Sequence, residues 1–235
     1  MLIGGVDVEL QERDQSIIHF INQFKVTTIR LTGSLFFPGK THEACRKRLQ
    51  VLTENKYISL SCNGFGRDYV FYPKGSRRFN AVEEGRRLAV TRFYVELVKA
   101  TERGILSYET YTKVDYAPFD LIVYFTYQDR RYLTFVNSSI YKKYPKEKIM
   151  NWYNDSKLFK TYIKDRYHDR VDGIMFINIV DKNISGKSLK TDKRFNLTEL
   201  DVQSKDFLNP LMAKIKKEEA KPMIRKVITK EDLIK

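Results

Sequence analysis

The sequence has few residues of the kinds that bind metals or form cross-links. Its 235 residues include two cysteines, three histidines and one tryptophan. Two cysteines cannot make a disulfide framework, and together with three scattered histidines they lack the ligand spacing of a structural zinc site. We therefore expect a reducing, cytoplasmic setting, and we predict no metal site and no cofactor.

Long apolar runs are also missing. No stretch approaches the roughly 18 apolar residues that a membrane helix requires. The apolar start is followed at once by Asp7 and Glu9, which argues against a signal peptide. We therefore expect no membrane partner. Hydrophobic residues still make up 42% of the chain, which suffices for a sizeable core in one or two domains.

Positive charge is abundant and uneven. The chain has 43 Lys and Arg residues against 29 Asp and Glu, a net charge of +14. The excess is densest in residues 25–75, whereas the residues before them are net acidic. Such an excess predicts a polyanionic partner, and nucleic acid is favoured because no basic amphipathic segment suggests an anionic membrane.

The basic stretch has the pattern of three helices followed by two strands. Asn63-Gly64, between the two strands, is a strong hairpin signal, and Thr28 and Thr41 stand where helix N-caps are expected. Apolar spacing predicts these elements over residues 14–24, 29–36, 42–55, 57–61 and 68–72. This order is typical of a winged helix-turn-helix, which we expect as an N-terminal domain at residues 1–75.

The rest of the chain predicts a mixed α/β domain, so the expected fold class is α+β. A linker and long helix occupy 76–104, and this helix is a candidate for pairing in a homodimer. Within the domain at 105–205, strands are predicted over 121–127, 132–136 and 173–180, and a helix over 146–167. Residues 206–235 form a charged C-terminal tail whose apolar positions either contact a partner or lie on the domain itself.

The helix predicted at 42–55 separates apolar and polar residues. Cys45, Leu49 and Leu52 share one stripe and are expected in the core. The opposite side carries Arg, Lys and Gln, which can bond guanine or adenine edges in a major groove. A solvated charged face is the alternative interpretation. The predicted site for double-stranded DNA comprises Lys40, Thr41 and His42 for phosphates, Arg46, Lys47 and Gln50 for bases, and Asn63 and Arg67 in a basic wing.

Residues 14–72 resemble the N-terminal winged helix of the replication-relaxation family of plasmid, phage and conjugative-element proteins. The resemblance rests on the helix entry from Leu31 to Phe37, on the basic helix segment at 45–52, and on the exit from Asn55 to Ile58. It implies a DNA-binding accessory protein that acts near an origin of replication or mobilisation. It also implies a replication protein or a relaxase as a possible partner.

Members of that family have a second domain that resembles a nuclease, in which Asp and Glu-x-Lys lie on adjacent strands. Here Pro118 and Asp120 match the first position, but Asn137-Ser138-Ser139 stand where Glu-x-Lys is needed. An amide does not supply the missing anionic ligand for Mg²⁺. We therefore expect a degenerate, non-enzymatic domain without catalytic residues. The alternatives are a metal-dependent nuclease centred on Asp120, a transcriptional repressor with a ligand- or partner-binding C-terminal domain, or an RNA-binding module.

Overall fold

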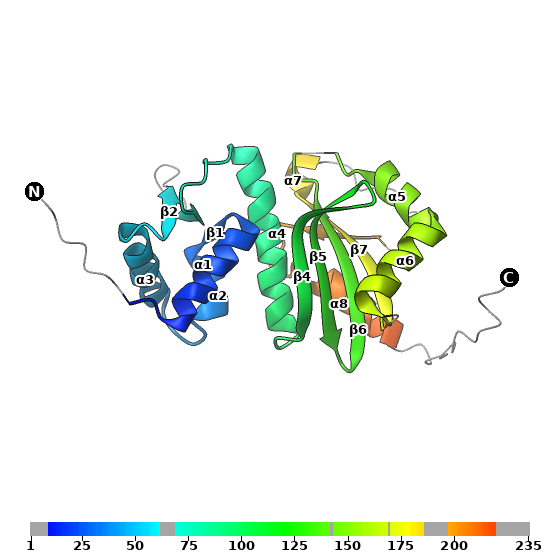
Figure 1. Ribbon diagram of the computed structural model, residues 1–235, viewed down its shortest axis with the longest axis horizontal. Helices are drawn as coiled ribbons and strands as arrows, with labels where there is room; N and C mark the ends of the chain where they lie inside the picture. The colour runs from blue at the N-terminus through cyan, green and yellow to red at the C-terminus, as the bar shows by residue number, and fades with distance from the viewer. Residues whose placement is uncertain (1–8, 62–68, 142, 169, 186–196, 220–235) are drawn as a thin grey trace, which may run out of the picture.

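The computed structural model describes residues 9–61, 69–141, 143–168, 170–185 and 197–219, and within them the chain is a mixed α and β protein with two sheets (Figure 1). The N-terminal unit comprises α1 (Glu12–Phe24), β1 (Thr27–Thr28), α2 (Ile29–Phe36), α3 (His42–Glu54), β2 (Ile58–Ser61) and β3 (Val70–Pro73). The rest comprises α4 (Ala81–Ala100), β4 (Ile105–Val114), β5 (Ala117–Tyr127), β6 (Arg130–Ser138), α5 (Lys146–Asn154), α6 (Ser156–Tyr167), β7 (Gly173–Val180), α7 (Lys182–Ser185), β8 (Leu197–Asp201) and α8 (Asn209–Glu219).

The N-terminal unit packs three helices beside a small antiparallel sheet of order β1-β3-β2. Its helices begin where the sequence predicts caps. The Thr28 hydroxyl accepts the N–H of Leu31 at 3.3 Å, and the Thr41 hydroxyl accepts that of Ala44 at 3.4 Å. Each cap satisfies a backbone donor that the first helical turn leaves without a partner. The predicted bounds of these helices are therefore confirmed to within two residues.

The larger sheet has the order β4-β5-β6-β7-β8 and lies between two layers of helices (Figure 1). Strands β4, β5 and β6 run antiparallel, whereas β7 and β8 run parallel to β6. One face packs against α4 and α8, and the other against α5 and α6. The predicted hairpin at Gln128-Asp129 and the buried strand at 173–180 are both confirmed.

Helix α4 lies at the centre of the molecule and is buried on more than one side. It contacts α1, α2 and β1 on one side, and β5 and β6 on the other. Its buried residues include Ala89, Val90, Phe93, Val95 and Leu97, and they join both halves in one hydrophobic cluster. Most of the apolar surface of this helix therefore packs within the protein, and its pairing with a second copy stays a prediction. The domain boundaries proposed from the sequence stay predictions.

One expectation is corrected, and one open alternative is decided. The helix predicted over 146–167 is divided into α5 and α6, because the Asp155 carboxylate accepts the N–H groups of Lys157 and Leu158 at 3.2 Å and starts a new helix. The predicted tail contains α8, whose Leu211 and Ile215 are fully buried in the main core. Within its described part, these apolar positions lie on the protein itself.

Candidate nucleic-acid interface

Helix α3 presents an apolar side to the core and a polar side to solvent, as predicted. Cys45, Leu49 and Leu52 are fully buried, whereas Arg46 and Lys47 are exposed. The Cys45 thiol donates to the Ile29 carbonyl at 3.6 Å, and burial raises its pKa to about 11. The thiol is therefore a neutral core group at physiological pH.

Two of the predicted base-reading side chains are paired with acidic neighbours on the same helix. The Arg46 guanidinium donates to both carboxylate oxygens of Glu43, at 2.7 and 2.6 Å. The Gln50 amide donates to Glu54 at 2.8 Å. Exposed pairs of this kind contribute little stability, so a phosphate or base edge can displace the carboxylates.

Arg48 lies on the same helix but points inward. Its guanidinium pairs with Asp14 of α1, which is fully buried and also accepts the Gln11 N–H at 2.9 Å. Burial alone raises the pKa of Asp14, but the hydrogen bonds from Arg48 and Gln11 outweigh it and hold that pKa below its usual range. This pair joins α3 to α1, so Arg48 positions the exposed face and does not belong to it.

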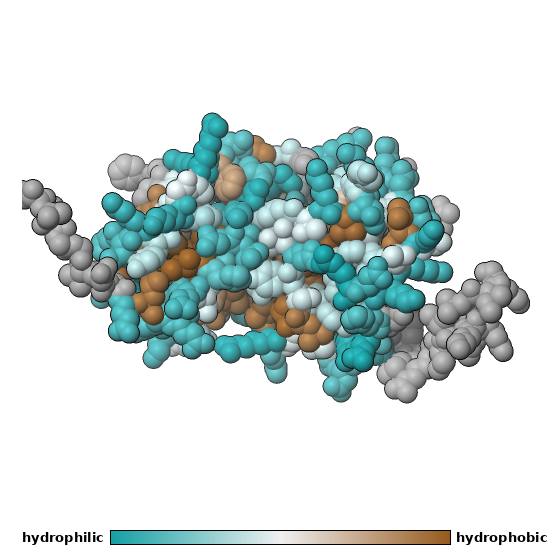
Figure 2. All heavy atoms as spheres, in the orientation of Figure 1, coloured by the Kyte–Doolittle hydropathy of each residue, from teal (hydrophilic) through white to brown (hydrophobic). Residues whose placement is uncertain are grey.

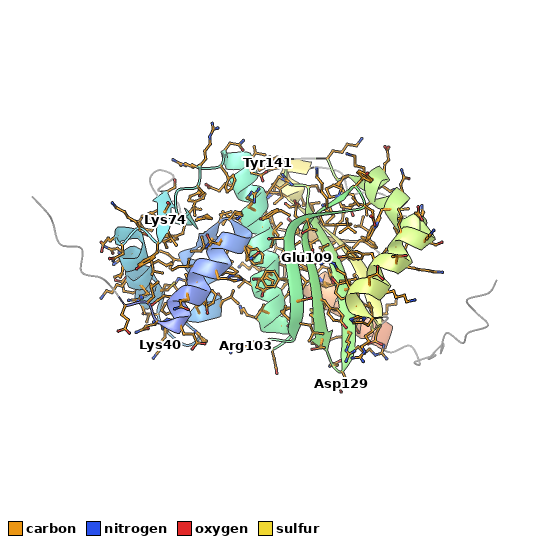
Figure 3. The ribbon with its side chains drawn as sticks, viewed as in Figure 1. Lys40, Lys74, Arg103, Glu109, Asp129 and Tyr141 are labelled. Carbon is orange, nitrogen blue, oxygen red and sulfur yellow. The ribbon has the colours of Figure 1, made fainter. Side chains whose placement is uncertain are left out.

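The start of α3 is open to solvent. Lys40, Thr41 and His42 are exposed, and Lys40 lies at the lower edge of the N-terminal unit (Figure 3). The N–H groups of the first helical turn add a favourable site for a phosphate. Asn63 and Arg67, the predicted wing residues, lie outside the described residues.

A groove of about 370 Å³ separates α3 from the strands β2 and β3. Arg46 and Gln50 line its helical side, and Leu60 and Tyr69 line the strand side. The latter two are large apolar side chains, each 42% exposed. An apolar surface can contact the methyl group of thymine, and the hydrogen-bonding groups beside it can bind the edges of bases. Sequence reasoning missed these two residues because apolar side chains in short strands are ordinarily assigned to the core.

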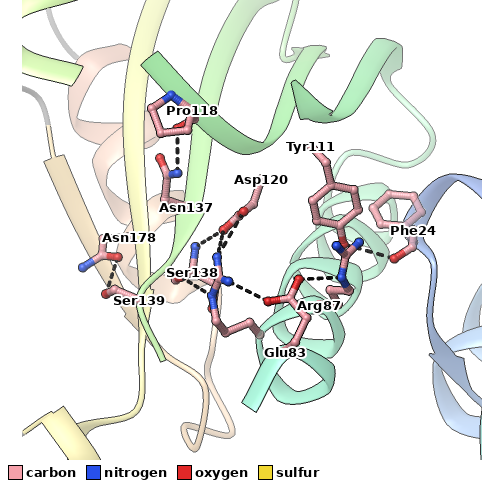
Figure 4. A network of polar contacts seen from close by, with 11 residues as sticks. Phe24, Glu83, Arg87, Tyr111, Pro118, Asp120, Asn137, Ser138, Ser139 and Asn178 are labelled. Atoms are coloured by element: carbon pink, nitrogen blue, oxygen red, sulfur yellow. Dashed lines mark hydrogen bonds and ion pairs between the residues drawn. The ribbon is translucent and has the colours of Figure 1, made fainter. Parts of the chain in front are cut away.

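The predicted nuclease position is occupied by a network of polar contacts (Figure 4). Both oxygens of Asp120 lie 3.3 Å from the Arg86 guanidinium, and one also accepts the Ser138 N–H at 2.8 Å. Arg86 in turn donates to Glu83 at 2.7 Å and to the Ser138 carbonyl at 3.1 Å. A guanidinium thus lies against the carboxylate that a metal ion would need.

The neighbouring strands place amides, not acids, beside Asp120. Asn137 lies at the end of β6, where its amide donates to the Pro118 carbonyl at 2.9 Å, and it pairs in register with Asn178 of β7. Throughout the described ranges, no three His, Cys, Asp or Glu side chains come together so as to hold a metal ion. The described part of this site therefore supplies charge pairing between α4 and the sheet.

Comparison with protein-family models and with curated proteins finds no match to this chain. Within the described residues, no helix is both long enough and apolar enough to cross a membrane.

Proposed function

We propose that the chain binds double-stranded DNA through an N-terminal winged helix-turn-helix. In this proposal α3 enters the major groove, and the connection between β2 and β3 forms the wing. The observation that carries it is the exposed face of α3, where Arg46, Lys47 and Gln50 stand together opposite a fully buried apolar stripe.

The surroundings of that face support the proposal. Helix α3 is held to α1 by the Arg48–Asp14 pair, so its outward side chains are presented by a supported element. The three-stranded sheet lies beside it, and Leu60 and Tyr69 add an apolar surface next to Arg46 and Gln50. A major groove accepts one α-helix, and specific contacts come from the few side chains that such a helix projects.

The test is binding to duplex DNA selected from a random pool, followed by fluorescence anisotropy. Arg46→Ala is expected to weaken binding to the selected site by about tenfold or more and to relax its preference at one position. Lys47→Ala should reduce the slope of log affinity against log salt by about 1 if the lysine contacts a phosphate.

Lys113→Ala is the matched control, since Lys113 is an exposed lysine on β4 of the larger sheet. It should leave both affinity and preference unchanged. Equal losses in the Lys47 and Lys113 variants would mean that net charge alone drives binding. Unchanged affinity and preference in the Arg46 variant would remove α3 from the interface.

We also propose that the protein is a cytoplasmic accessory factor of a mobile element, as its resemblance to the replication-relaxation family implies. A transcriptional repressor is the rival role. Footprinting on an element that carries both a replication or transfer origin and a promoter separates the two. Protection of the origin supports the accessory role, and protection confined to the promoter supports the repressor. Sedimentation on the bound site then measures whether one or two copies bind.

We further propose that the larger sheet is not a nuclease, because Arg86 pairs with Asp120 and Asn137 replaces an acid. Incubation of supercoiled plasmid with Mg²⁺ or Mn²⁺ tests this. No nicking is expected. Cleavage that is lost in Asp120→Ala would contradict the proposal.

A further inference from the structure

A groove lies between α1, the second half of α4 and the start of β4. It consists of two adjoining hollows of about 500 and 730 Å³, which share His19, Tyr94, Val98, Arg103 and Tyr108. The space-filling view shows the surface hollowed at the lower edge of the molecule, between the N-terminal unit and the sheet (Figure 2). No residue that lines either hollow belongs to α3, whose surface is proposed to bind DNA.

The groove is closed at one end by hydrogen bonds to the last turn of α1 and the residues after it. The hydroxyls of Thr110, Tyr111 and Thr91 donate to the carbonyls of residues 23, 24 and 26, at 3.1, 3.0 and 3.1 Å respectively. No such bond joins the first half of α1 to α4 or β4 within the described chain. The hollow therefore lies between three elements, α1, α4 and β4, that are fixed to one another near the end of α1.

The floor of the groove is aromatic. The ring centroids of Tyr94 and Tyr108 lie 4.7 Å apart, and the ring centroid of Phe20 lies 6.2 Å from that of Tyr94. Burial raises the pKa of both tyrosines, so their hydroxyls stay protonated donors at neutral pH. Neither hydroxyl has a hydrogen-bond partner within the residues that the structure describes.

Arg103 stands at the mouth of the groove on a fixed turn (Figure 3). The next residue, Gly104, accepts the Thr126 N–H at 2.7 Å. A Cβ at Gly104 would clash with the Thr126 carbonyl oxygen, so only glycine permits this close approach. The Arg103 guanidinium has no ion-pair partner in the described part of the chain. Glu12, an acidic residue, lines only the larger hollow, whereas Arg103 lines both.

We propose that this groove binds a planar aromatic anion. The ring of the ligand stacks on Tyr94 and Tyr108, and its negative group pairs with Arg103. Aromatic rings favour offset or edge contacts with other rings, and a guanidinium binds a carboxylate through charge-assisted hydrogen bonds. His19 and the two phenol hydroxyls supply further polar contacts on the walls. This proposal does not depend on the DNA-binding function.

The test uses naphthoate and its uncharged analogue naphthalenemethanol, each titrated into the full chain by calorimetry in the absence of DNA. Saturable binding of naphthoate is expected, with the alcohol weaker by about tenfold, the size of one charge-assisted contact. Absence of saturable naphthoate binding, or equal affinity for the two compounds, would overturn the proposal.

Variants locate the site. Arg103→Gln should weaken naphthoate by about tenfold and leave the alcohol unchanged, while Tyr94→Phe, which keeps the ring, should weaken naphthoate by only a few fold. Lys99→Gln is the matched control, because Lys99 is an exposed cation on α4 that does not line the groove. An equal loss in Lys99→Gln and Arg103→Gln would show unspecific attraction to charge and would also overturn the proposal.

Discussion

Among the described residues, two ion pairs join a glutamate to an arginine three residues later on the same helix. On α3, Glu43 and Arg46 meet at 2.6 Å with side chains 50% and 45% exposed. On α4, Glu83 and Arg86 meet at 2.7 Å, but Arg86 is only 13% exposed and also reaches Asp120 of β5. The local sequence signal is the same, whereas the surroundings differ.

The difference shows how burial decides what an ion pair does. Water screens the α3 pair, so its arginine can leave Glu43 for a phosphate or a base at little cost. The α4 pair is held inside a network with Asp120 and the Ser138 backbone, so removal of Arg86 breaks several hydrogen bonds at once. The first pair therefore suits the proposed DNA surface, whereas the second joins α4 to the sheet.

The largest effect is expected from Arg86→Ala. This change removes the guanidinium's hydrogen bonds to Asp120, Glu83 and the Ser138 carbonyl, so the free energy of unfolding should fall by about 3 kcal/mol. Chemical denaturation followed by circular dichroism measures it. Arg46→Ala is the matched variant and should show no change in the denaturation midpoint. If both variants unfold at the same denaturant concentration as the parent, the distinction between the two pairs does not hold.

A smaller effect is expected at Asp14, whose contribution to stability should depend on pH. The Arg48 and Gln11 hydrogen bonds hold the pKa of Asp14 below its ordinary value of 3.8, so folding favours the ionised carboxylate. The stability that this contributes is present above the unfolded-state pKa and is lost as the pH falls through the lower folded-state value. Asp14→Asn should therefore be less stable than the parent at pH 7, by about 2 kcal/mol, and the gap should narrow toward acid pH. Thermal melts from neutral to acid pH test this, and a constant gap would contradict it.

Helices α1, α2 and α3 are predicted closely because their signals are local. Apolar spacing and the caps Thr28 and Thr41 lie within the segments that they define. The outward position of Arg46 and Lys47 follows from the same periodicity. Arg48 shows the limit of such reasoning. Arg48 follows Lys47 directly in the sequence, but its partner Asp14 is 34 residues away. Only the packing of α3 on α1 reveals this pair.

The larger sheet is predicted less well, for physical reasons. Strand β4 is half-buried along most of its length and has a register shift between Ile105 and Ser107, so its residues do not alternate clearly. Its turn into β5 uses Asp115 and Tyr116, both with positive φ, where a hairpin signal would normally include glycine or asparagine. The burial of helix α4 on two sides is not predicted either, because its contact with both the N-terminal unit and the sheet is a tertiary property.

The smallest effect concerns the α3 pair itself and tests it directly. Glu43→Gln removes the carboxylate that holds Arg46 and also removes a negative charge from the proposed DNA surface. DNA affinity is therefore expected to rise by about two- to fivefold at low salt, and the gain should shrink as salt screens the lost repulsion. Glu83→Gln is the matched substitution on α4. It should lower thermal stability and leave DNA affinity unchanged, because its arginines pair within the protein. Anisotropy titrations at two salt concentrations measure the DNA affinity of both variants. An equal gain of affinity in the Glu83 and Glu43 variants would mean that overall charge controls binding, and not the position of Arg46.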